Sequence, residues 1–423
     1  MFAMVPSPPP IVQKRNVLIF MAALTLICGW GLQNKYVLAL GEIYTVILTL
    51  AWWSARGMFD TANAAREHYP RAFEGSRVDA VLRTRTRRKR PVYLLEILDH
   101  FPPAADERVR HLVRSPFDAR RHYEIHYEKM CVRRRGPYVI GPVTLRAADP
   151  LGLFLQTRTL PVLTDLLVYP QARELPVLSV LGEGTLFHVG QETTARAGHS
   201  EEFVRLRDYR SGDSPLHIHW PSSARHGRFI VKEFQETVVT ELTLIVDLTR
   251  LSQTGIGDQT STELIVRVAA SIAARAIELS HLVEMYVVGA AIDHVTLGGG
   301  GRHLTSLLDR LALCRAEGRG LFSDRLPELT VDVRRGATVA IVSGAASLNL
   351  ETLESVVRQL LLSGARVILA LIDERGFIKL TREQDVVHAA AEPFDRIVLQ
   401  LRLAGADVVP IRHGENMQQC FAR

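Results

Sequence analysis

Cysteine is scarce in this chain of 423 residues, and the motifs of most hydrolases and nucleotide-binding enzymes are missing. The four cysteines stand far apart and include no C-x-x-C pair: Cys28, Cys131, Cys314 and Cys420. This spacing excludes a disulfide framework and the common zinc motifs, and it is typical of unpaired thiols in a reducing compartment. The sequence also has no G-x-S-x-G, no H-E-x-x-H and no G-x-x-x-x-G-K-[ST]. These absences leave no recognisable nucleophile, zinc-protease site or phosphate-binding loop.

Long apolar runs occur only near the start of the chain. The first, Val17 to Leu32, follows a short segment (residues 1–15) that is Pro-rich at Ser7–Pro10 and that we predict to be disordered. It has about 16 residues, fewer than the ~20 expected for a membrane span. A second run extends from Tyr36 to Trp53, and no small-residue cleavage site of a signal peptide separates the two. We therefore predict two transmembrane helices within residues 16–54.

Positively charged residues precede the first predicted transmembrane helix and follow the second: Lys14, Arg15, Arg56, Arg66 and Arg71. The polar turn between the two runs contains only Lys35. The positive-inside rule then places both flanks in the cytoplasm, and with them the bulk of the chain.

The middle of the chain alternates with period two, which predicts strands. The β-rich runs cover residues 78–90, 91–98, 122–132 and 138–147. Pro, Gly and Asp turns separate them, which favours a small β-sandwich-like domain over residues 76–170. We predict a helical linker over residues 55–75.

A basic run lies in this domain. Arg83, Arg85 and Arg87 alternate with threonines, so in a strand the three guanidinium groups share one face. Contact with anionic lipid, nucleic-acid binding and a solvated edge strand remain open as interpretations. Because no aromatic residue is interleaved, we expect no nucleic-acid partner. The mild net charge of +6 suits a protein beside an anionic membrane surface.

From residue 238 onward, strands and helices alternate. Predicted strands cover residues 239–246, 283–288, 338–342, 367–372 and 406–411, and predicted helices cover 263–280, 303–316, 350–362 and 393–403. This alternation predicts a Rossmann-like parallel sheet flanked by helices over residues 238–423. The glycine run from Gly298 to Gly301 follows a β segment that ends at Leu297, and we predict it to be a flexible hairpin or loop.

Residues 171–237 combine charges, aromatics and turns at high density. They include R-D-Y-R-S-G-D from Arg207, I-H-W from Ile218 and V-K-E-F from Val231, and a further motif, R-R-R-G-P-Y-V-I-G-P, begins at Arg133. These motifs resemble the signature of domain-of-unknown-function family 58. The signature residues are Arg205, Arg207, Asp208, Tyr209, Gly212, Asp213, Trp220, Arg225, Lys232 and Glu233. We interpret them as a clasp between the two domains, with a docking surface as an overlapping alternative.

The resemblance implies a bacterial plasma-membrane protein with a C-terminal von Willebrand factor A-like domain, encoded beside a MoxR-type AAA ATPase. It implies a non-catalytic adaptor that acts through protein–protein interaction and presents its A-like domain to that ATPase. Remodelling or maturation of client complexes would be the outcome, with membrane lipids as further contacts. Neither the resemblance nor the residues name a client.

A-type domains hold Mg²⁺ or Mn²⁺ through D-x-S-x-S at the end of their first strand, because hard cations prefer oxygen ligands. Here that segment begins Asp247-Leu248-Thr249. Thr249 provides a hydroxyl at the position of the first serine, but Leu251 stands at the position of the second serine and has none. Gly344 stands where a later acid is expected. We therefore expect no resident cofactor. A metal-dependent ligand-binding domain is the alternative function.

Three histidines near Trp220 offer a second alternative, a His-centred hydrolase or zinc site. His217 and His219 would share one face of a strand, and His226 follows. A zinc site needs three or four ligands, and with no cysteine nearby Asp213 would have to complete it.

Overall fold

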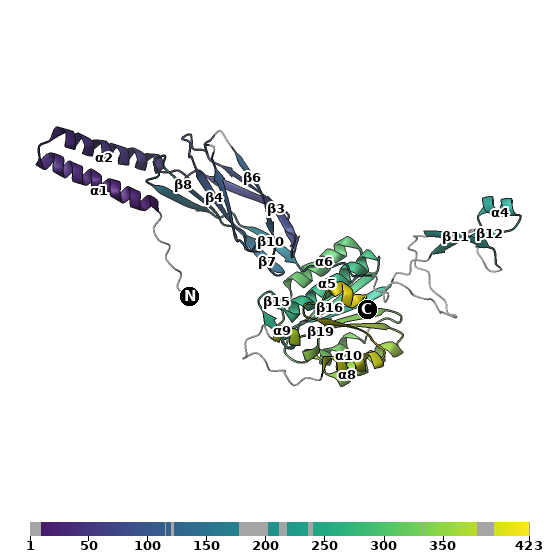
Figure 1. Ribbon diagram of the computed structural model, residues 1–423. Coiled ribbons are helices and arrows are strands. Elements are labelled where there is room, and N and C mark those ends of the chain that lie inside the picture. Colours follow the sequence, from purple (N-terminus) through teal and green to yellow (C-terminus); the bar gives the residue numbers. More distant parts are fainter. Residues whose placement is uncertain are drawn as a thin grey trace. The chain divides into compact units, whose positions relative to one another are not determined.

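A computed structural model describes residues 10–114, 116–119, 122–176, 202–210, 218–235, 240–331, 333–378 and 393–422 of the chain (Figure 1). Two compact units are present. One comprises Met1–Gln171 with Leu308–Leu313, and the other comprises Ala172–Leu307 with Cys314–Arg423. Helices and several sheets occur together, as a multidomain α/β protein requires.

Two helices open the chain, α1 (Pro10–Gly31) and α2 (Lys35–Ala55). Asn34 caps α2, because its side chain accepts hydrogen bonds from the backbone N–H of Tyr36 (3.0 Å) and Val37 (3.4 Å). The helices approach closely at glycine: a Cβ on Gly29 would lie 2.6 Å from the backbone nitrogen of Leu38. Within the described part of the chain, α2 is the one helix that is long and apolar enough to cross a membrane.

Ten strands follow in the first unit. They are β1 (Asn63–His68), β2 (Arg71–Phe73), β3 (Arg77–Arg85), β4 (Leu95–His100), β5 (Arg108–Val113), β6 (Tyr123–Met130), β7 (Gly136–Ile140), β8 (Val143–Ala148), β9 (Leu155–Leu160) and β10 (Thr164–Tyr169). They form three antiparallel or mixed sheets, ordered β1-β3-β6, β2-β10-β7 and β5-β4-β8-β9. Leu82, Ile97 and Leu145, one from each of three strands, are fully buried in one apolar core.

The helical linker predicted over residues 55–75 is wrong, because α2 ends at Ala55 and β1 and β2 occupy most of the stretch. The reason lies in Arg66 of β1, whose side chain is buried and forms an ion pair with Asp99 of β4. Its Nε donates to Asp99 Oδ2 at 2.9 Å, and the hydroxyl of Tyr127 donates to the same oxygen at 2.6 Å. Tertiary pairing therefore overrides the local helical preference, and the β-rich domain begins before residue 76.

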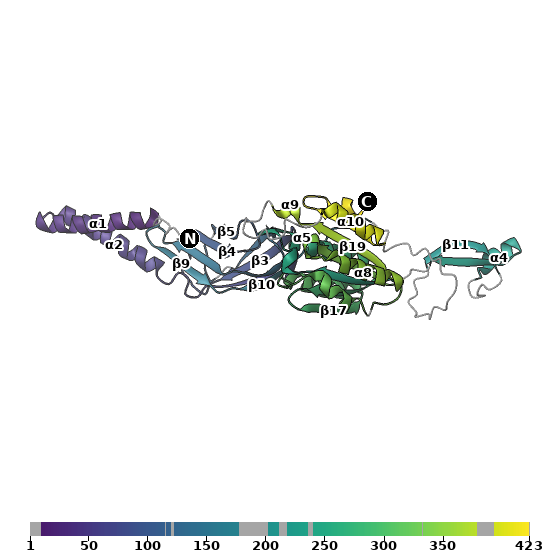
Figure 2. The same ribbon diagram turned by 90° about the horizontal axis from the view of Figure 1, so that it is seen from below.

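The second unit is built on a six-stranded sheet of order β17-β16-β13-β18-β19-β20. Its strands are β13 (Glu241–Asp247), β16 (Leu282–Val288), β17 (Ile292–Gly298), β18 (Thr338–Gly344), β19 (Arg366–Asp373) and β20 (Asp407–Arg412). All neighbours are parallel except β16 and β17, so the sheet is parallel except at its edge strand β17 (Figure 2).

Helices cover both faces of this sheet, as buried parallel strands require (Figure 1). The main ones are α5 (Ser261–Glu278), α6 (Gly300–Leu313), α8 (Leu350–Leu362) and α10 (Phe394–Leu403). Each matches a helix predicted from periodicity to within a few residues at either end. The glycine run is not the predicted loop: β17 ends at Gly298 and α6 begins at Gly300, whose φ of +79° suits glycine.

Candidate functional site

Carboxyl and hydroxyl side chains gather at the carboxyl ends of β13, β18 and β19. We call this set the switch-point cluster, and its members are Asp247, Thr249, Ser252, Ser343, Ser347 and Glu374. All six are buried. The strand order of the sheet reverses between β13 and β18, and ligands of open α/β sheets generally bind outside the strand ends at such a point.

Asp247 lies at the centre of the cluster and is fully buried. Its Oδ1 accepts hydrogen bonds from the backbone N–H (2.9 Å) and the hydroxyl (2.8 Å) of Thr249. Its Oδ2 accepts hydrogen bonds from the hydroxyls of Ser343 (2.8 Å) and Ser347. Burial raises the pKa of Asp247, although these four hydrogen bonds oppose the rise. Protein donors thus occupy both oxygens of the carboxylate.

Glu374 supplies a second carboxyl that the sequence motif did not reveal. A Cβ on Gly344 would clash with Glu374 Oε1, so this carboxyl occupies the space of the side chain missing at position 344. The backbone N–H of Ala346 donates to Oε2 at 2.8 Å, whereas Oε1 is buried with no hydrogen-bond partner in the described structure. Burial raises the pKa of Glu374 to about 8, and the nearby charge of Asp247 contributes. Glu374 therefore carries a proton at neutral pH.

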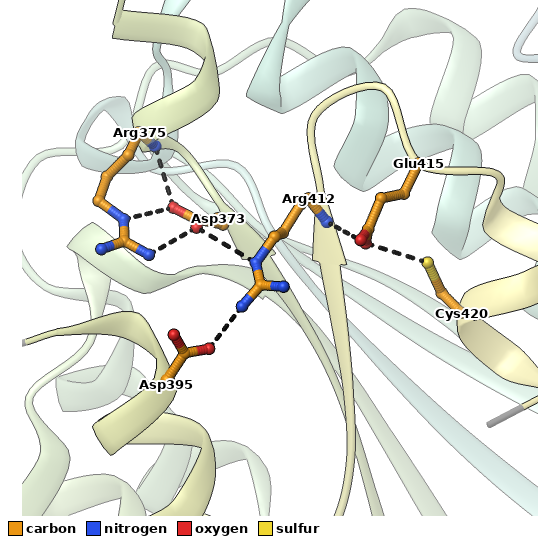
Figure 3. A network of polar contacts seen from close by, with 6 residues as sticks. All are labelled: Asp373, Arg375, Asp395, Arg412, Glu415 and Cys420. Atoms are coloured by element: carbon orange, nitrogen blue, oxygen red, sulfur yellow. Dashed lines mark hydrogen bonds and ion pairs between the residues drawn. The ribbon is translucent and has the colours of Figure 1, made fainter.

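Asp373 precedes Glu374 in the chain, and its pKa is shifted in the opposite direction. Burial would raise the pKa of Asp373, but hydrogen bonds from Arg375 outweigh it and lower that pKa. Arg375 donates from Nε (2.8 Å) and Nη2 (2.7 Å), and Arg412 links Asp373 to Asp395 (Figure 3). Asp373 is thus held ionised by two arginines, while Glu374 faces the protein interior and is held neutral.

The cluster does not fit the Mg²⁺ or Mn²⁺ site that an A-like domain would imply. The structure brings the two predicted metal residues together, but both oxygens of Asp247 already accept hydrogen bonds, from Thr249 and from Ser343. Ser252, one place out of register, donates to the carbonyl of Thr249 at 2.8 Å. Across the described part of the chain, no group of three or more His, Cys, Asp or Glu side chains could hold a metal.

We expect Mg²⁺ or Mn²⁺ at millimolar concentration to leave the melting temperature of the protein unchanged, because a cation would have to displace the hydrogen bonds to Asp247. Differential scanning fluorimetry at pH 7 with either ion, against Ca²⁺ and a chelator as controls, measures this. A rise of several degrees with Mg²⁺ or Mn²⁺ alone would show that the cluster opens to bind metal.

The signature segment forms a small module that we call the signature hairpin. Strand β11 (Glu202–Asp208) pairs antiparallel with β12 (Ile230–Gln235), and the short helix α4 (Trp220–His226) lies between them in sequence. Arg205 is paired in register with Glu233, and Arg207 with Val231. Gly212 and Asp213 lie outside the described residues. For Arg205, Arg207, Lys232 and Glu233 only the backbone is described, so the clasp stays a prediction.

Two of the three histidines serve the short helix α4. His219 caps it, because its Nδ1 accepts a hydrogen bond from the backbone N–H of Ser222 (3.3 Å). Nδ1 of His226 lies 2.9 Å from the carbonyl oxygen of Ser222. His217 lies outside the described residues. These contacts explain the two described histidines as helix-terminal residues and give no support to a hydrolase or zinc site.

Three exposed aromatic residues pack edge to face on the signature hairpin. The ring of Phe229 lies 6.1 Å from that of Tyr209 and 6.3 Å from that of Trp220, measured between centroids. Trp220 and Phe229 keep 62% and 56% of their surface exposed. We call this trio the aromatic tip. Its neighbours include exposed Arg225 and an ion pair of Arg228 with Asp208 at 3.0 Å. Phe229 was not among the predicted site residues.

The basic run has the predicted alternation, since Arg83, Arg85 and Arg87 are exposed while the threonines between them are buried. Its strand β3 is the central strand of the β1-β3-β6 sheet, so the edge-strand interpretation is wrong. Arg83 forms ion pairs with Glu67 and Glu124 across the neighbouring strands, which neutralise its charge. Less free positive charge remains on this face than the sequence suggested.

Comparison with known proteins supports the resemblance. Residues 205–375 match a family model described as "Protein of unknown function DUF58". This match extends from the signature hairpin to the switch-point cluster, so both candidate sites lie within the family's region. No curated protein matches the chain.

Solved structures share only low overall similarity with the chain. A cohesin module from a Clostridium perfringens family 33 glycoside hydrolase is 16% identical, with a TM-score of 0.19, and the match covers 26% of this chain and 96% of that one. Manganese-loaded Plasmodium vivax TRAP protein is 13% identical, with a TM-score of 0.24 and coverages of 41% and 75%. A Pseudomonas fluorescens alkylpurine DNA glycosylase is 12% identical, with a TM-score of 0.17 and coverages of 39% and 48%.

Proposed function

We propose that this protein is a non-catalytic, membrane-anchored adaptor that presents a von Willebrand factor A-like domain to a MoxR-type AAA ATPase, for remodelling or maturation of client complexes. The class of partner comes from the family resemblance. The observation that carries the adaptor role is the aromatic tip, because exposed large aromatic side chains beside arginines are typical of protein interfaces.

Interface energies concentrate in Trp, Tyr and Arg, and the aromatic tip contains the first two of these types. Trp220 contacts Phe229 only edge to face, which leaves most of the indole surface for a partner. Exposed Arg225 favours a partner surface with acidic groups at its rim, whereas Arg228 is already paired with Asp208. We therefore favour docking over the clasp as the main role of this module.

The membrane anchor of the proposal is α2, with α1 as a second span. The short turn capped by Asn34 would lie on the outer side, and both ends of the pair on the cytoplasmic side. This two-pass topology agrees with the concentration of arginine and lysine at the two helix ends that are far from the connecting turn. It would place the signature hairpin and the α/β sheet in the cytoplasm, where an ATPase has access to ATP.

The switch-point cluster supports the non-catalytic part of the proposal. Both oxygens of Asp247 accept hydrogen bonds inside the protein, and Glu374 is buried against Gly344. A general base or nucleophile must reach its substrate, and neither carboxyl is exposed. We infer that these groups hold the ends of β13, β18 and β19 together.

Trp220→Ala with Phe229→Ala is expected to lower recovery of the ATPase about tenfold or more, because interface aromatics often contribute 2 kcal/mol or more each. The measurement is co-purification from detergent-solubilised native membranes, with a slowly hydrolysed ATP analogue and with ADP. Tyr69→Ala is the matched control, since Tyr69 is an aromatic residue that is 72% exposed in the β-rich domain. Full recovery with the double variant would contradict docking at the aromatic tip. Absence of any AAA ATPase with the wild type, in either nucleotide, would contradict the adaptor role.

A further inference from the structure

Arginines gather around two tryptophans where α2 meets the β-rich domain. The guanidinium carbon of Arg90 lies 3.5 Å from the centre of the Trp53 ring, and that of Arg56 lies 5.2 Å from the Trp52 ring. Arg88 Nη2 donates a hydrogen bond to the carbonyl oxygen of Ser54 at 2.8 Å. These residues belong to one compact unit, so their mutual arrangement is set by the fold.

The positive charge of this group is only partly offset within the described structure, where the charge of Asp60 acts on Arg88. None of Arg56, Arg88 and Arg90 forms an ion pair with a carboxylate there, in contrast to Arg83 with its two glutamates. Burial lowers the pKa of Arg88, and the like charge of Arg90 lowers it further. Arg88 Nη1 is buried and has no hydrogen-bond partner among the described residues. An anion close to these guanidinium groups would relieve their repulsion.

The tryptophans indicate where that anion would be. Trp52 and Trp53 are about half exposed and lie near the end of the apolar helix that can cross a membrane. Tryptophan prefers the level of the lipid headgroups, and guanidinium groups bind phosphate through paired hydrogen bonds. An open depression of about 520 Å³ follows the helix directly, lined by Gly57 to Asp60 and by Gln156 to Arg158. Gly57 in this lining directly follows Arg56 in sequence, and the lining holds one further arginine, Arg158, together with Asp60.

We propose that Arg56 and Arg90, placed against Trp52 and Trp53, bind the phosphate of an anionic phospholipid at the membrane surface. Arg88 acts as the positioning residue, because it ties the end of α2 to the strand that leads to Arg90. The site differs from the basic run, of which Arg83 and Arg85 lie on the exposed face of β3 and Arg87 lies just after the strand. The inference rests on the membrane anchor of the proposed function and is independent of the ATPase.

The test uses the full chain in nanodiscs that contain phosphatidylcholine and phosphatidylglycerol in equal amounts. Native mass spectrometry after transfer to detergent measures which lipid remains bound. The wild type is expected to retain phosphatidylglycerol, and Arg56→Gln with Arg90→Gln to retain about thirtyfold less, since each of the two basic contacts near an anionic surface contributes about 1 kcal/mol. Arg85→Gln with Arg87→Gln is the control with equal loss of charge, and it is expected to retain the lipid as the wild type does.

Equal retention of phosphatidylglycerol by the wild type and the Arg56/Arg90 variant would overturn the inference. So would a loss confined to the Arg85/Arg87 variant, which would instead place the lipid on β3. Excess inorganic phosphate is expected to leave the lipid bound, and complete displacement would indicate a site for free phosphate. Alkaline carbonate extraction separates the two proposals: release of the chain from membranes contradicts the anchor, whereas retention without lipid preference contradicts only the lipid site.

Discussion

Asp99→Ala is expected to destabilise the β-rich domain by about 3–5 kcal/mol, the cost of leaving a buried charge without its partner. The side chains of Asp99 and Arg66 are fully buried. Asp99 accepts hydrogen bonds from Arg66 and from the hydroxyl of Tyr127, and burial raises the pKa of Tyr127 above its usual range. Urea unfolding of the full chain in detergent, followed by amide hydrogen exchange in β1, β4 and β6, measures the loss.

Two further variants decide whether burial is the cause. Arg66→Met combined with Asp99→Leu is expected to recover much of the loss, since apolar residues can replace a buried pair at little cost. Glu128→Ala breaks an exposed pair with Arg77 (3.4 Å) and is expected to cost less than about 1 kcal/mol. A loss below about 1 kcal/mol for Asp99→Ala would mean that water reaches Arg66 in the folded state.

The C-terminal sheet and helices were largely predictable from the sequence. Strands such as β18 and β19 are continuous apolar runs because helices cover both faces of the sheet, and nearly every residue in them is buried. The helix α5 has an apolar face with the expected spacing of three and four residues. The edge strand β17 gives a weaker signal, because its side chains are only partly buried and polar residues interrupt the apolar pattern.

Elements that are stabilised by contacts with residues far away in the sequence were not predictable. Arg66 looks like an ordinary surface residue of a helix until Asp99, which is 33 positions later, provides a buried partner. The strand that contains it therefore gives no local signal. The same applies to Phe229, because its contacts with Tyr209 and Trp220 depend on the pairing of β11 with β12.

Of the two central carboxyls of the candidate site, the sequence predicted Asp247 but not Glu374. Asp247 was recognisable as an acid at the end of a buried strand. A-type domains carry a second acid at the position of Gly344, at the end of β18. The glycine there therefore suggested that this acid was lost. The carboxyl comes instead from Glu374 at the end of the neighbouring strand β19, across the pairing of Gly344 with Ile372. Its one local signal is the pair Asp373–Glu374 directly after a buried run.

Glu374→Gln is expected to remove a pH dependence of stability and to stabilise the protein at pH 8 by a few kcal/mol. The folded protein keeps the proton on Glu374 up to a pKa of about 8, whereas the unfolded chain loses it near the ordinary value of 4.5. Between these values the folded state binds more protons, so the free energy of unfolding falls as pH rises, by about 1.4 kcal/mol per pH unit. Glutamine keeps the shape of the neutral acid and cannot ionise.

Urea unfolding of the wild type and of Glu374→Gln at pH 5 and pH 8 measures this difference. The two proteins are expected to differ little at pH 5, where both side chains are neutral in the folded state and the pH is only slightly above the unfolded value of 4.5, and to diverge at pH 8. Glu317→Gln is the control, because Glu317 is exposed and its removal should leave the pH dependence of the wild type unchanged. If wild type and Glu374→Gln keep parallel profiles, Glu374 is ionised in the folded state. The switch-point cluster would then contain a carboxylate with a free oxygen, and cation binding at Asp247 would regain support.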